Sequence, residues 1–385
     1  MSAFFLRALD VLHFRGNQSF GDPGSYGQTQ RLPWPSVASG ALRSALLVRK
    51  DLKPTPRDGW TEPDPELGTP DRPGRFTLRG WTPAWRKGTH LERLLPLPAD
   101  LVVQRHGQEL LVRKLRPVSL HPKLAASTPL PHVAVLAEAR RIKPEGGYWL
   151  DETGWAAYVR GEPIPPQHLV SDEALWRLDE RVGIGLDERR RAAADGKLFS
   201  LQALAPRHDG REVGYLAETE GAAFPERLSL RLGGDGRAAI AEAVSVDPLQ
   251  QPDPHQMQQA RRCRLVLTTP GLFPHGWLPT GADPAERRND GAVRFALHGL
   301  QGWIVAAALP RGQVVSGWDL ARWRPKTALR SVPMGSVWWL ELDEGIPPES
   351  YAKLVAQGLW DETQYDGDPR RAEGYNRIAF ALWND

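Results

Sequence analysis

Proline and glycine interrupt this chain throughout its length and limit the regular elements that it can form. The sequence contains 37 glycines and 35 prolines among 385 residues. Proline lacks a backbone donor and glycine favours turns, so this usage suits short strands joined by ordered turns. The pattern therefore argues against an all-helical protein.

The length of the chain predicts more than one domain. It exceeds the roughly 250 to 300 residues at which a single hydrophobic core stops growing. Hydrophobic residues make up 41% and charged residues 25%, which is typical of globular proteins. We place the two domains at residues 1–220 and 221–385. Strands interleaved with a few helices in each half predict an α+β fold.

Three segments of the N-terminal part carry clear local signals. Alternation at Leu9, Val11 and His13 within FLRALDVLHF, residues 5–14, predicts a first strand. Apolar residues that recur on one face predict a helix over 35–49, with Ser36 as its N-cap. Residues 53–75 contain too many prolines for a helix or strand and predict a surface loop.

Two hairpins follow in the second half of the chain. Val182, Ile184 and Leu186 alternate, and a second apolar run begins at Leu198. The tip between these runs is slightly basic, with Arg189, Arg190, Arg191 and Lys197 against Asp187, Glu188 and Asp195. Another hairpin is predicted around the turn dipeptide Asp235-Gly236. The C-terminal third adds four short apolar strands.

Several kinds of chemistry have no support in the sequence. HExxH, GxxxxGK[ST] and GxSxG patterns are absent, and a single Cys263 excludes a disulfide framework or a thiolate zinc cluster. We expect no metal, no cofactor and no catalytic residue. The longest uncharged apolar run, 303–309, is far shorter than the ~20 residues that span a bilayer. These features predict a cytoplasmic protein that does not associate with membranes.

A segment rich in cations and aromatics lies between residues 316 and 336. Its basic residues interleave with two tryptophans and face one acid, Asp319; they are Trp318, Arg322, Trp323, Arg324, Lys326 and Arg330. Cations can bind phosphates while aromatic faces stack on bases, so the segment suits single-stranded RNA. The alternative is a solvated loop that its tryptophans anchor to the core.

Two further features are weaker. His13 stands beside Arg15 near the end of a predicted strand, where it could act in acid/base cleavage of RNA or serve as a structural histidine. A glycine, Gly374, precedes the last predicted strand and could let the backbone approach a ligand.

Six motifs taken in order resemble one family. They are LDVLHFRGNQSFG, PSVASGALRSALL, RVGIGLDERRRAAADGKLFS, LGGDGR, VSGWDLARWRPKTALRSVPMGSVWWLE and EGYNRIAF. Together they resemble the CRISPR-associated RAMP proteins that form the third Cmr subunit of type III-B effector complexes. The resemblance runs from about Leu9 to Phe380, with the proline-rich loops as variable parts.

The resemblance implies a fold, partners and a role. It implies two ferredoxin-like domains related to the RNA-recognition fold, and a non-catalytic subunit that caps the crRNA 5′ handle in antiviral defence. The implied partners are crRNA, the large polymerase-like Cmr subunit, the backbone RAMP subunit and, indirectly, target RNA. The protein would hold the guide while base pairing selects the target.

The resemblance also implies which residues contact RNA. The hairpin near 181–205 would be a thumb that wedges against the guide, and EGYNRIAF would be a glycine-rich loop. With the basic and aromatic segment, the predicted RNA-binding residues are Arg15, Gly183, Arg189, Arg190, Arg191, Lys197, Phe199, Trp318, Arg322, Arg324, Lys326, Arg330, Gly374 and Asn376. Leu198 also matches the family motif. The triple arginine at 189–191 departs from the family pattern and predicts additional phosphate contacts at the tip.

Two other functions remain open at this point. One is an endoribonuclease of the same superfamily that processes CRISPR repeat RNA, with His13 as general acid or base. The other is a Trp-rich glycan-binding protein or glycosidase that uses Asp187 and Glu188. These carboxylates are adjacent, so on a strand they would point to opposite faces, which is a poor geometry for paired acid/base work.

Overall fold

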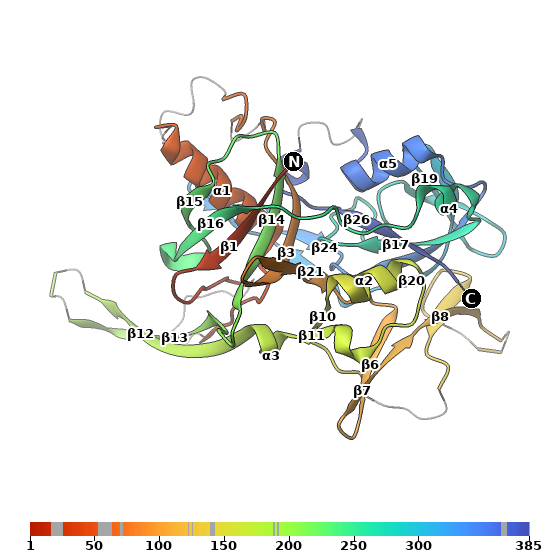
Figure 1. Ribbon diagram of the computed structural model, residues 1–385, viewed down its shortest axis with the longest axis horizontal. Coiled ribbons are helices and arrows are strands. Elements are labelled where there is room, and N and C mark those ends of the chain that lie inside the picture. The colour runs from red at the N-terminus through yellow and green to blue at the C-terminus, as the bar shows by residue number, and fades with distance from the viewer. Residues whose placement is uncertain are drawn as a thin grey trace. The chain divides into compact units, whose positions relative to one another are not determined.

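The protein divides into two compact units, each with its own sheet (Figure 1). The structure is a computed structural model that describes residues 1–16, 26–52, 64–69, 72–121, 123–124, 126–138, 143–187, 189–190, 192–362 and 368–384. The first unit comprises Met1–Arg93, Ser171–Val246 and Val315–Ala328, and the second comprises Leu94–Val170, Asp247–Val314 and Leu329–Asp385. The fold is α+β and rich in strands, as the sequence predicts.

These units differ from the predicted consecutive domains 1–220 and 221–385. The predicted boundary separates β14 (Glu212–Glu220) from β16 (Ala238–Val244), yet both strands pair with β1 (Ser2–Ala8). Pairing between segments distant in the chain therefore joins residues on both sides of position 220 into one sheet.

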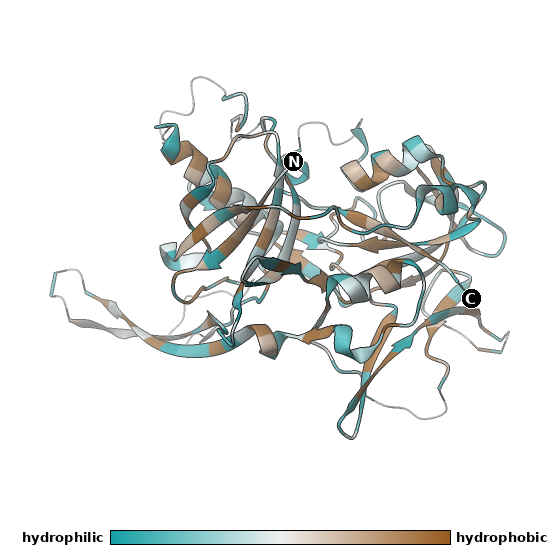
Figure 2. Ribbon diagram, viewed as in Figure 1, coloured by the Kyte–Doolittle hydropathy of each residue, from teal (hydrophilic) through white to brown (hydrophobic). Residues whose placement is uncertain are grey.

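The first unit is built on a six-stranded antiparallel sheet. Its strand order is β15 (Arg227–Arg231), β16, β1, β14, β3 (Thr77–Lys87) and β4 (His90–Arg93). Helix α1 (Pro35–Arg49) packs against β15 and β3. Hydrophobic residues run along the strands of both sheets (Figure 2).

Two local predictions for this unit were wrong in detail. The first strand covers Ser2–Ala8, earlier than the alternating residues 9–13 of the predicted stretch 5–14, because Phe4, Phe5 and Leu6 are buried whereas the chain bends at 9–10. Helix α1 covers the predicted range, but Trp34 is its N-cap residue and Ser36 lies inside the helix. Pro35 at the first helical position explains this, since it has no N–H that needs a cap.

The hairpin predicted around Asp235-Gly236 is confirmed. Strands β15 and β16 pair in antiparallel register, and the turn includes a short 3₁₀ helix, η2 (Gly234–Gly236). Asp235 and Gly236 both have positive φ, +57° and +62°, as the turn requires.

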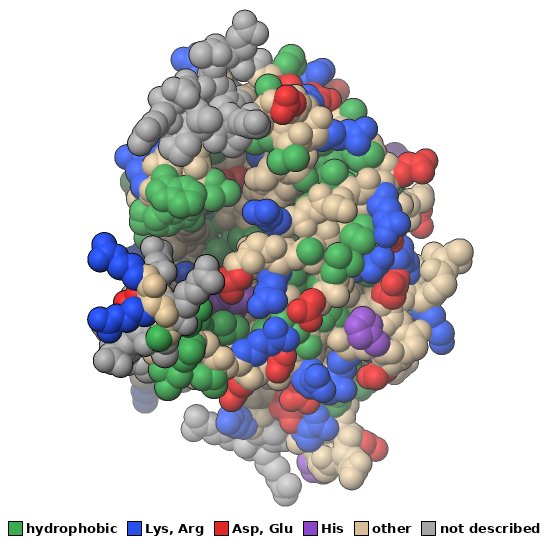
Figure 3. Space-filling view, turned by 90° about the vertical axis from the view of Figure 1, so that its left-hand side faces the viewer, with side chains coloured by type: hydrophobic (Ala, Val, Ile, Leu, Met, Phe, Trp, Pro, Cys, Tyr) green, Lys and Arg blue, Asp and Glu red, His purple; other side chains and the backbone are tan. Residues whose placement is uncertain are grey.

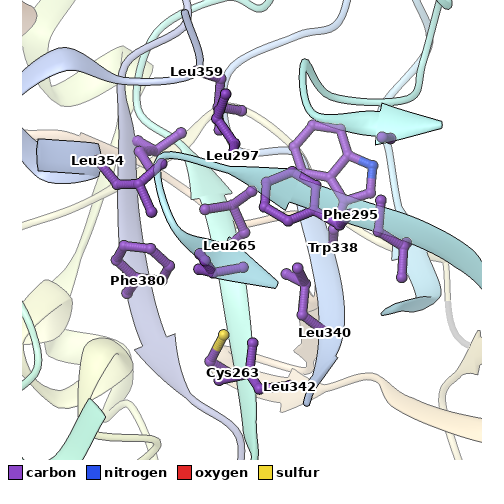
Figure 4. Close-up of a cluster of buried hydrophobic side chains, with 14 of the residues drawn as sticks. Cys263, Leu265, Phe295, Leu297, Trp338, Leu340, Leu342, Leu354, Leu359 and Phe380 are labelled. Atoms are coloured by element: carbon purple, nitrogen blue, oxygen red, sulfur yellow. The ribbon is translucent and has the colours of Figure 1, made fainter. Parts of the chain in front are cut away.

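The second unit contains another six-stranded antiparallel sheet. Its order is β18 (Ala282–Arg287), β19 (Val293–Leu297), β20 (Leu300–Ala308), β25 (Val337–Leu342), β17 (Arg262–Leu267) and β26 (Ile378–Leu382). The predicted C-terminal strands are therefore present. Successive side chains of β25 point to opposite faces of the sheet, and both faces are buried. Trp338 packs in a cluster with Cys263 and Phe380 on one face (Figure 4), and Trp339 packs in a cluster with Trp155 on the other.

Shorter elements surround this second sheet. Helices α4 (Pro254–Gln259) and α5 (Pro348–Gln357) contact each other and contribute Met257 and Leu354 to the cluster in Figure 4. Helix α2 (Glu152–Val159) packs against β26. The remaining elements of the unit are β5 (Leu95–Pro96), β6 (Leu101–His106), β7 (Glu109–Lys114), β8 (Arg116–Ser119), β9 (His132–Val135), β10 (Tyr148–Leu150), η1 (Pro166–His168), β21 (Gln313–Val315), β24 (Leu329–Ser331) and α7 (Pro369–Ala372), with β11 (Leu169–Ser171) at its border.

A buried ion pair crosses the second unit. Arg264 and Asp100 are fully buried and lie 2.5 Å apart. The Arg264 guanidinium also donates to the carbonyls of Leu382 and Tyr158, and the Tyr158 hydroxyl donates to the other Asp100 oxygen at 2.9 Å. Every charge in this network therefore has a partner, as burial demands.

Removing one member of the pair should strongly destabilise the unit. Asp100→Ala leaves the Arg264 charge buried without its partner, so the free energy of unfolding should fall by about 3–5 kcal/mol. Glu162→Ala, which breaks the exposed pair with Arg160, should change it by less than about 1 kcal/mol. Denaturant unfolding of the two variants measures the difference, and similar values would show that Arg264 relaxes into water.

Candidate nucleic-acid interface

A long two-stranded hairpin projects from the sheet of the first unit (Figure 1). Strand β12 (Trp176–Leu186) pairs with β13 (Ala193–Pro206) in antiparallel register, with an irregularity between Ile184 and Leu186. This confirms the hairpin predicted near 181–205. Its base is fixed to the unit, because Leu12 and Leu204 exchange backbone hydrogen bonds of 2.9 and 2.7 Å.

One face of the hairpin exposes aliphatic side chains. Val182 is 71% exposed, and Ile184 and its cross-strand partner Leu198 are 51% and 55% exposed. Leu186 continues the same face at 58%. A contiguous apolar patch that is exposed to solvent often marks a site that binds a partner or ligand. We name Val182, Ile184, Leu186 and Leu198 the aliphatic face.

The opposite face pairs a glycine with an aromatic ring. Gly183 lies directly across from Phe199. A Cβ at Gly183 would lie 2.4 Å from the Phe199 Cζ, so the ring would have to move if any other residue stood here. This cross-strand contact fixes the ring over the strand and gives Gly183 a packing role.

The hairpin tip is an ordered turn that presents cations. Oδ1 of Asp187 accepts from the backbone N–H groups of Arg189 and Arg190, each at 2.9 Å. Both arginine side chains are exposed, and neither has a hydrogen-bond or ion-pair partner among the described residues. Arg191 and Glu188 lie outside the described residues, as does the side chain of Lys197. Oδ1 of Asp187 thus serves the turn, and Glu188, the other member of the glycosidase pair, is among the residues that are not described.

The basic and aromatic segment forms a second projecting turn in the first unit. Strand β22 (Trp318–Asp319) pairs with β23 (Arg324–Pro325), and Arg322 forms an ion pair of 2.8 Å with Asp319. Arg324 is exposed, and Lys326 is half-buried. Arg330 is exposed on β24, which belongs to the second unit.

The structure gives Asn376 a structural role rather than a surface position. Asn376 is fully buried; its Oδ1 accepts from Leu272 N–H at 2.6 Å, and its Nδ2 donates to the carbonyls of Leu272 and Leu359. All polar atoms of this side chain thus hold loops together inside the unit, and its contact with RNA stays a prediction. Gly374 is also buried, with φ of +91°.

His13 is likewise a structural residue. It is 2% exposed, and its Nδ1 lies 2.9 Å from the Gln202 carbonyl on the hairpin. Arg15, by contrast, is exposed.

The single cysteine, Cys263, is buried. Burial raises the pKa of its thiol to about 12, so the thiolate, which is the reactive form, is disfavoured.

Within the described residues, no group of three His, Cys, Asp or Glu side chains could hold a metal ion. The same part of the chain contains no helix with the length and apolar character needed to cross a membrane.

The structure adds a basic concavity that the sequence did not reveal. A hollow of about 410 Å³ in the first unit is lined by Arg86, Lys87, His208 and Arg211, with Glu212 as the acid. Arg211 lies over the Trp85 ring at 5.1 Å. These residues come from two turns far apart in the sequence, so no local pattern could have predicted their proximity. On the face of the molecule that Figure 3 draws, Lys and Arg side chains are interspersed with Asp and Glu.

Comparisons with known proteins place this geometry in context. A family model described as CRISPR-associated protein (Cas_Cmr3) matches residues 4–383. A chain from the cryo-EM structure of the type III-B Cmr-beta bound to cognate target RNA and AMPPnP, state 1, has a TM-score of 0.50 and 14% identity, covering 98% of each chain. A chain from the Cmr-beta structure bound to cognate target RNA has a TM-score of 0.49 and 14% identity, covering 98% of this chain and 96% of that one. The search of curated proteins gave no match. At this identity, the structural likeness concerns the fold.

The contact between Gly183 and Phe199 can be tested directly. Gly183→Ala should push the ring off the strand and loosen the hairpin, because the new Cβ would overlap the ring. Hydrogen exchange of β12 and β13 amides should become faster. Gly40→Ala in α1 meets no atom within 4 Å and should stabilise the protein by about 0.5–1 kcal/mol. Unchanged hairpin exchange in Gly183→Ala would mean that Phe199 is not held there.

Proposed function

Because this chain belongs to the Cas_Cmr3 family of CRISPR-associated proteins, we propose that it is a crRNA-binding subunit of a type III-B effector complex. In this proposal it caps the crRNA 5′ handle and bridges the large polymerase-like subunit to the backbone RAMP subunit. It contacts target RNA only through the guide. The complex works in the cytoplasm in antiviral defence.

The hairpin β12–β13 is the observation that carries this proposal. Its aliphatic face can wedge against bases, as apolar side chains do where proteins unstack nucleic acids. Arg189 and Arg190 at the tip can bind phosphates, which supply most of the affinity of a protein for nucleic acid. Both chemistries extend beyond the sheet of the first unit, where a guide strand can reach them.

The fold supports the same role. Each unit has an antiparallel sheet, and α1 packs on the sheet of the first unit. In this proposal the two units are ferredoxin-like domains related to the RNA-recognition fold. The neighbouring Cmr-beta chain comes from an assembly bound to target RNA, which supports target RNA as an indirect partner.

We propose no catalytic step for this subunit. The endoribonuclease alternative needs His13 to reach a substrate, yet this ring is buried with its Nδ1 at a backbone carbonyl. The glycosidase alternative assigns catalysis to Asp187, yet one oxygen of this carboxylate holds the hairpin tip. Both positions therefore support a binding role.

The RNA that accompanies the protein tests the proposal. After purification of the assembled complex through this subunit, the bound RNAs should share a repeat-derived 5′ end. The matched control is a complex purified through another subunit from cells that lack this chain. In the control complex, nuclease should digest the repeat-derived 5′ end of the bound RNA more readily. Bound RNAs with unrelated 5′ ends would contradict handle capping.

Neutralising the hairpin tip should weaken guide binding in a salt-dependent way. Replacing Arg189, Arg190 and Arg191 by Ala should lower the slope of log affinity against log salt by about 0.7 for each phosphate that the variant no longer neutralises. Arg160→Ala, an exposed arginine paired with Glu162 in the second unit, serves as the control and should leave the slope unchanged. An unchanged slope in the triple variant would show that these arginines face solvent.

A further inference from the structure

Two tryptophans of the first unit, Trp318 and Trp323, are exposed to solvent. Trp318 is 49% and Trp323 67% exposed, whereas every other described tryptophan is buried or half-buried. Their rings meet edge to face, with centroids 6.0 Å apart and planes at 87°. The pair therefore forms a corner in which each ring leaves an aromatic surface toward solvent.

The backbone that carries this corner is an ordered turn. Lys326 N–H donates to the Gly317 carbonyl at 2.8 Å, which closes the turn at its base. Oδ1 of Asp319 accepts from the N–H groups of Ala321 and Arg322 at 3.0 and 3.1 Å. The exposed rings are thus held by a hydrogen-bonded scaffold rather than left on an irregular loop.

The backbone at Trp323 is strained. Its φ is +53°, in the left-handed region where a bulky side chain is a genuine outlier. The other described non-glycine residues with positive φ are Asp51, Asp235, His298 and Asn376, which are residue types that tolerate this region. Glycine would adopt this backbone conformation at position 323 with a lower free-energy cost. Strain of this kind concentrates at functional sites, where the side chain is what the site needs.

The charges around the corner suit an anionic partner. Arg322, Arg324 and Lys326 lie within five residues, and the only acid between 317 and 326 is Asp319, which pairs with Arg322. Arg324 is exposed and has no hydrogen-bond or ion-pair partner among the residues that the structure describes. A partner with both negative charge and flat apolar groups matches this surface.

We propose that Trp318 and Trp323 form a stacking corner for one unpaired nucleobase of single-stranded RNA, with Arg324 and Lys326 on the flanking phosphates. The proposal rests on the proposed function and specifies how a second site of the first unit holds the strand. A base that stacks on one ring presents its edge to the face of the other ring. Stacking accepts any base, so the corner adds affinity without sequence preference.

Binding to a matched pair of oligonucleotides tests the corner. The full-length protein is titrated with a uridine oligonucleotide and with one of equal length and charge whose central positions are abasic. The wild type should bind the uridine oligonucleotide about 5- to 150-fold more tightly, the range expected for stacking of one base. Trp318→Ala should abolish most of this difference. Arg324→Ala with Lys326→Ala should weaken binding of both oligonucleotides and lower the salt slope.

Trp323→Gly separates binding from folding. Glycine relieves the left-handed strain, so the melting temperature should stay the same or rise while the preference for uridine over abasic RNA falls. Trp323→Phe keeps an aromatic face and should retain most of the preference. Leu320→Ala removes an apolar side chain, 59% exposed, from the same turn and should leave the preference intact.

The possible outcomes distinguish this inference from the proposed function. Tryptophan variants that keep the full base preference overturn the stacking corner, even if the protein still carries guide RNA. Tryptophan variants that lose a protein subunit but keep the preference overturn it too, in favour of a protein interface. A base preference that depends on the tryptophans, in a protein whose bound RNAs lack a repeat-derived end, supports the corner and contradicts the proposed function alone.

Discussion

The pairing of β1 with both β14 and β16 organises the first unit, and the projecting hairpin depends on it. Strand β13 continues through residues 207–211 into β14, so the hairpin grows directly out of the central part of the sheet. Leu12 and His13, which follow β1, fix the base of the hairpin through the backbone of Leu204 and Gln202. Among the described residues, these anchoring contacts lie at the base of the hairpin, and the outer half carries the aliphatic face and the cationic tip.

Both projecting turns of the first unit share a physical design. In each, an aspartate at the start of the turn accepts backbone N–H groups: Asp187 at the hairpin tip and Asp319 in the tryptophan turn. This local cap fixes the backbone without help from a core. It allows the neighbouring apolar and cationic side chains to remain exposed, because the order of the turn does not depend on burying them. Exposed Ile184 and Trp323 are therefore compatible with a defined geometry.

Local patterns in the sequence predicted much of the secondary structure, but not what depends on distant contacts. The range of α1 and the strands flanking Asp235 follow from periodicity and turn chemistry, which act within a few residues. The division into units does not, because it follows from which distant strands pair with β1. The sequence patterns also did not show which side chains are buried. Asn376 could have faced a ligand or the interior, and only the carbonyls of Leu272 and Leu359 decide between them. Alternation at 182–186 indicated a strand without showing that its apolar side stays exposed.

The electrostatics of the protein depend on which arginines remain unpaired rather than on how many there are. The net charge is only +3, although Lys and Arg together number 49. Many arginines are engaged within the structure: Arg86 contacts Glu212 and Glu242, and Arg288 contacts Asp290 and Glu341, contacts that lower the pKa of Glu242 and Asp290. Such pairs stabilise the folded chain and contribute little field to a distant anion. Arg189, Arg190 and Arg324 are among the exposed arginines without an acid beside the guanidinium in the described part of the chain, and each lies on a projecting turn. These turns combine unpaired cations with exposed apolar side chains, and this combination supports the proposed RNA partner.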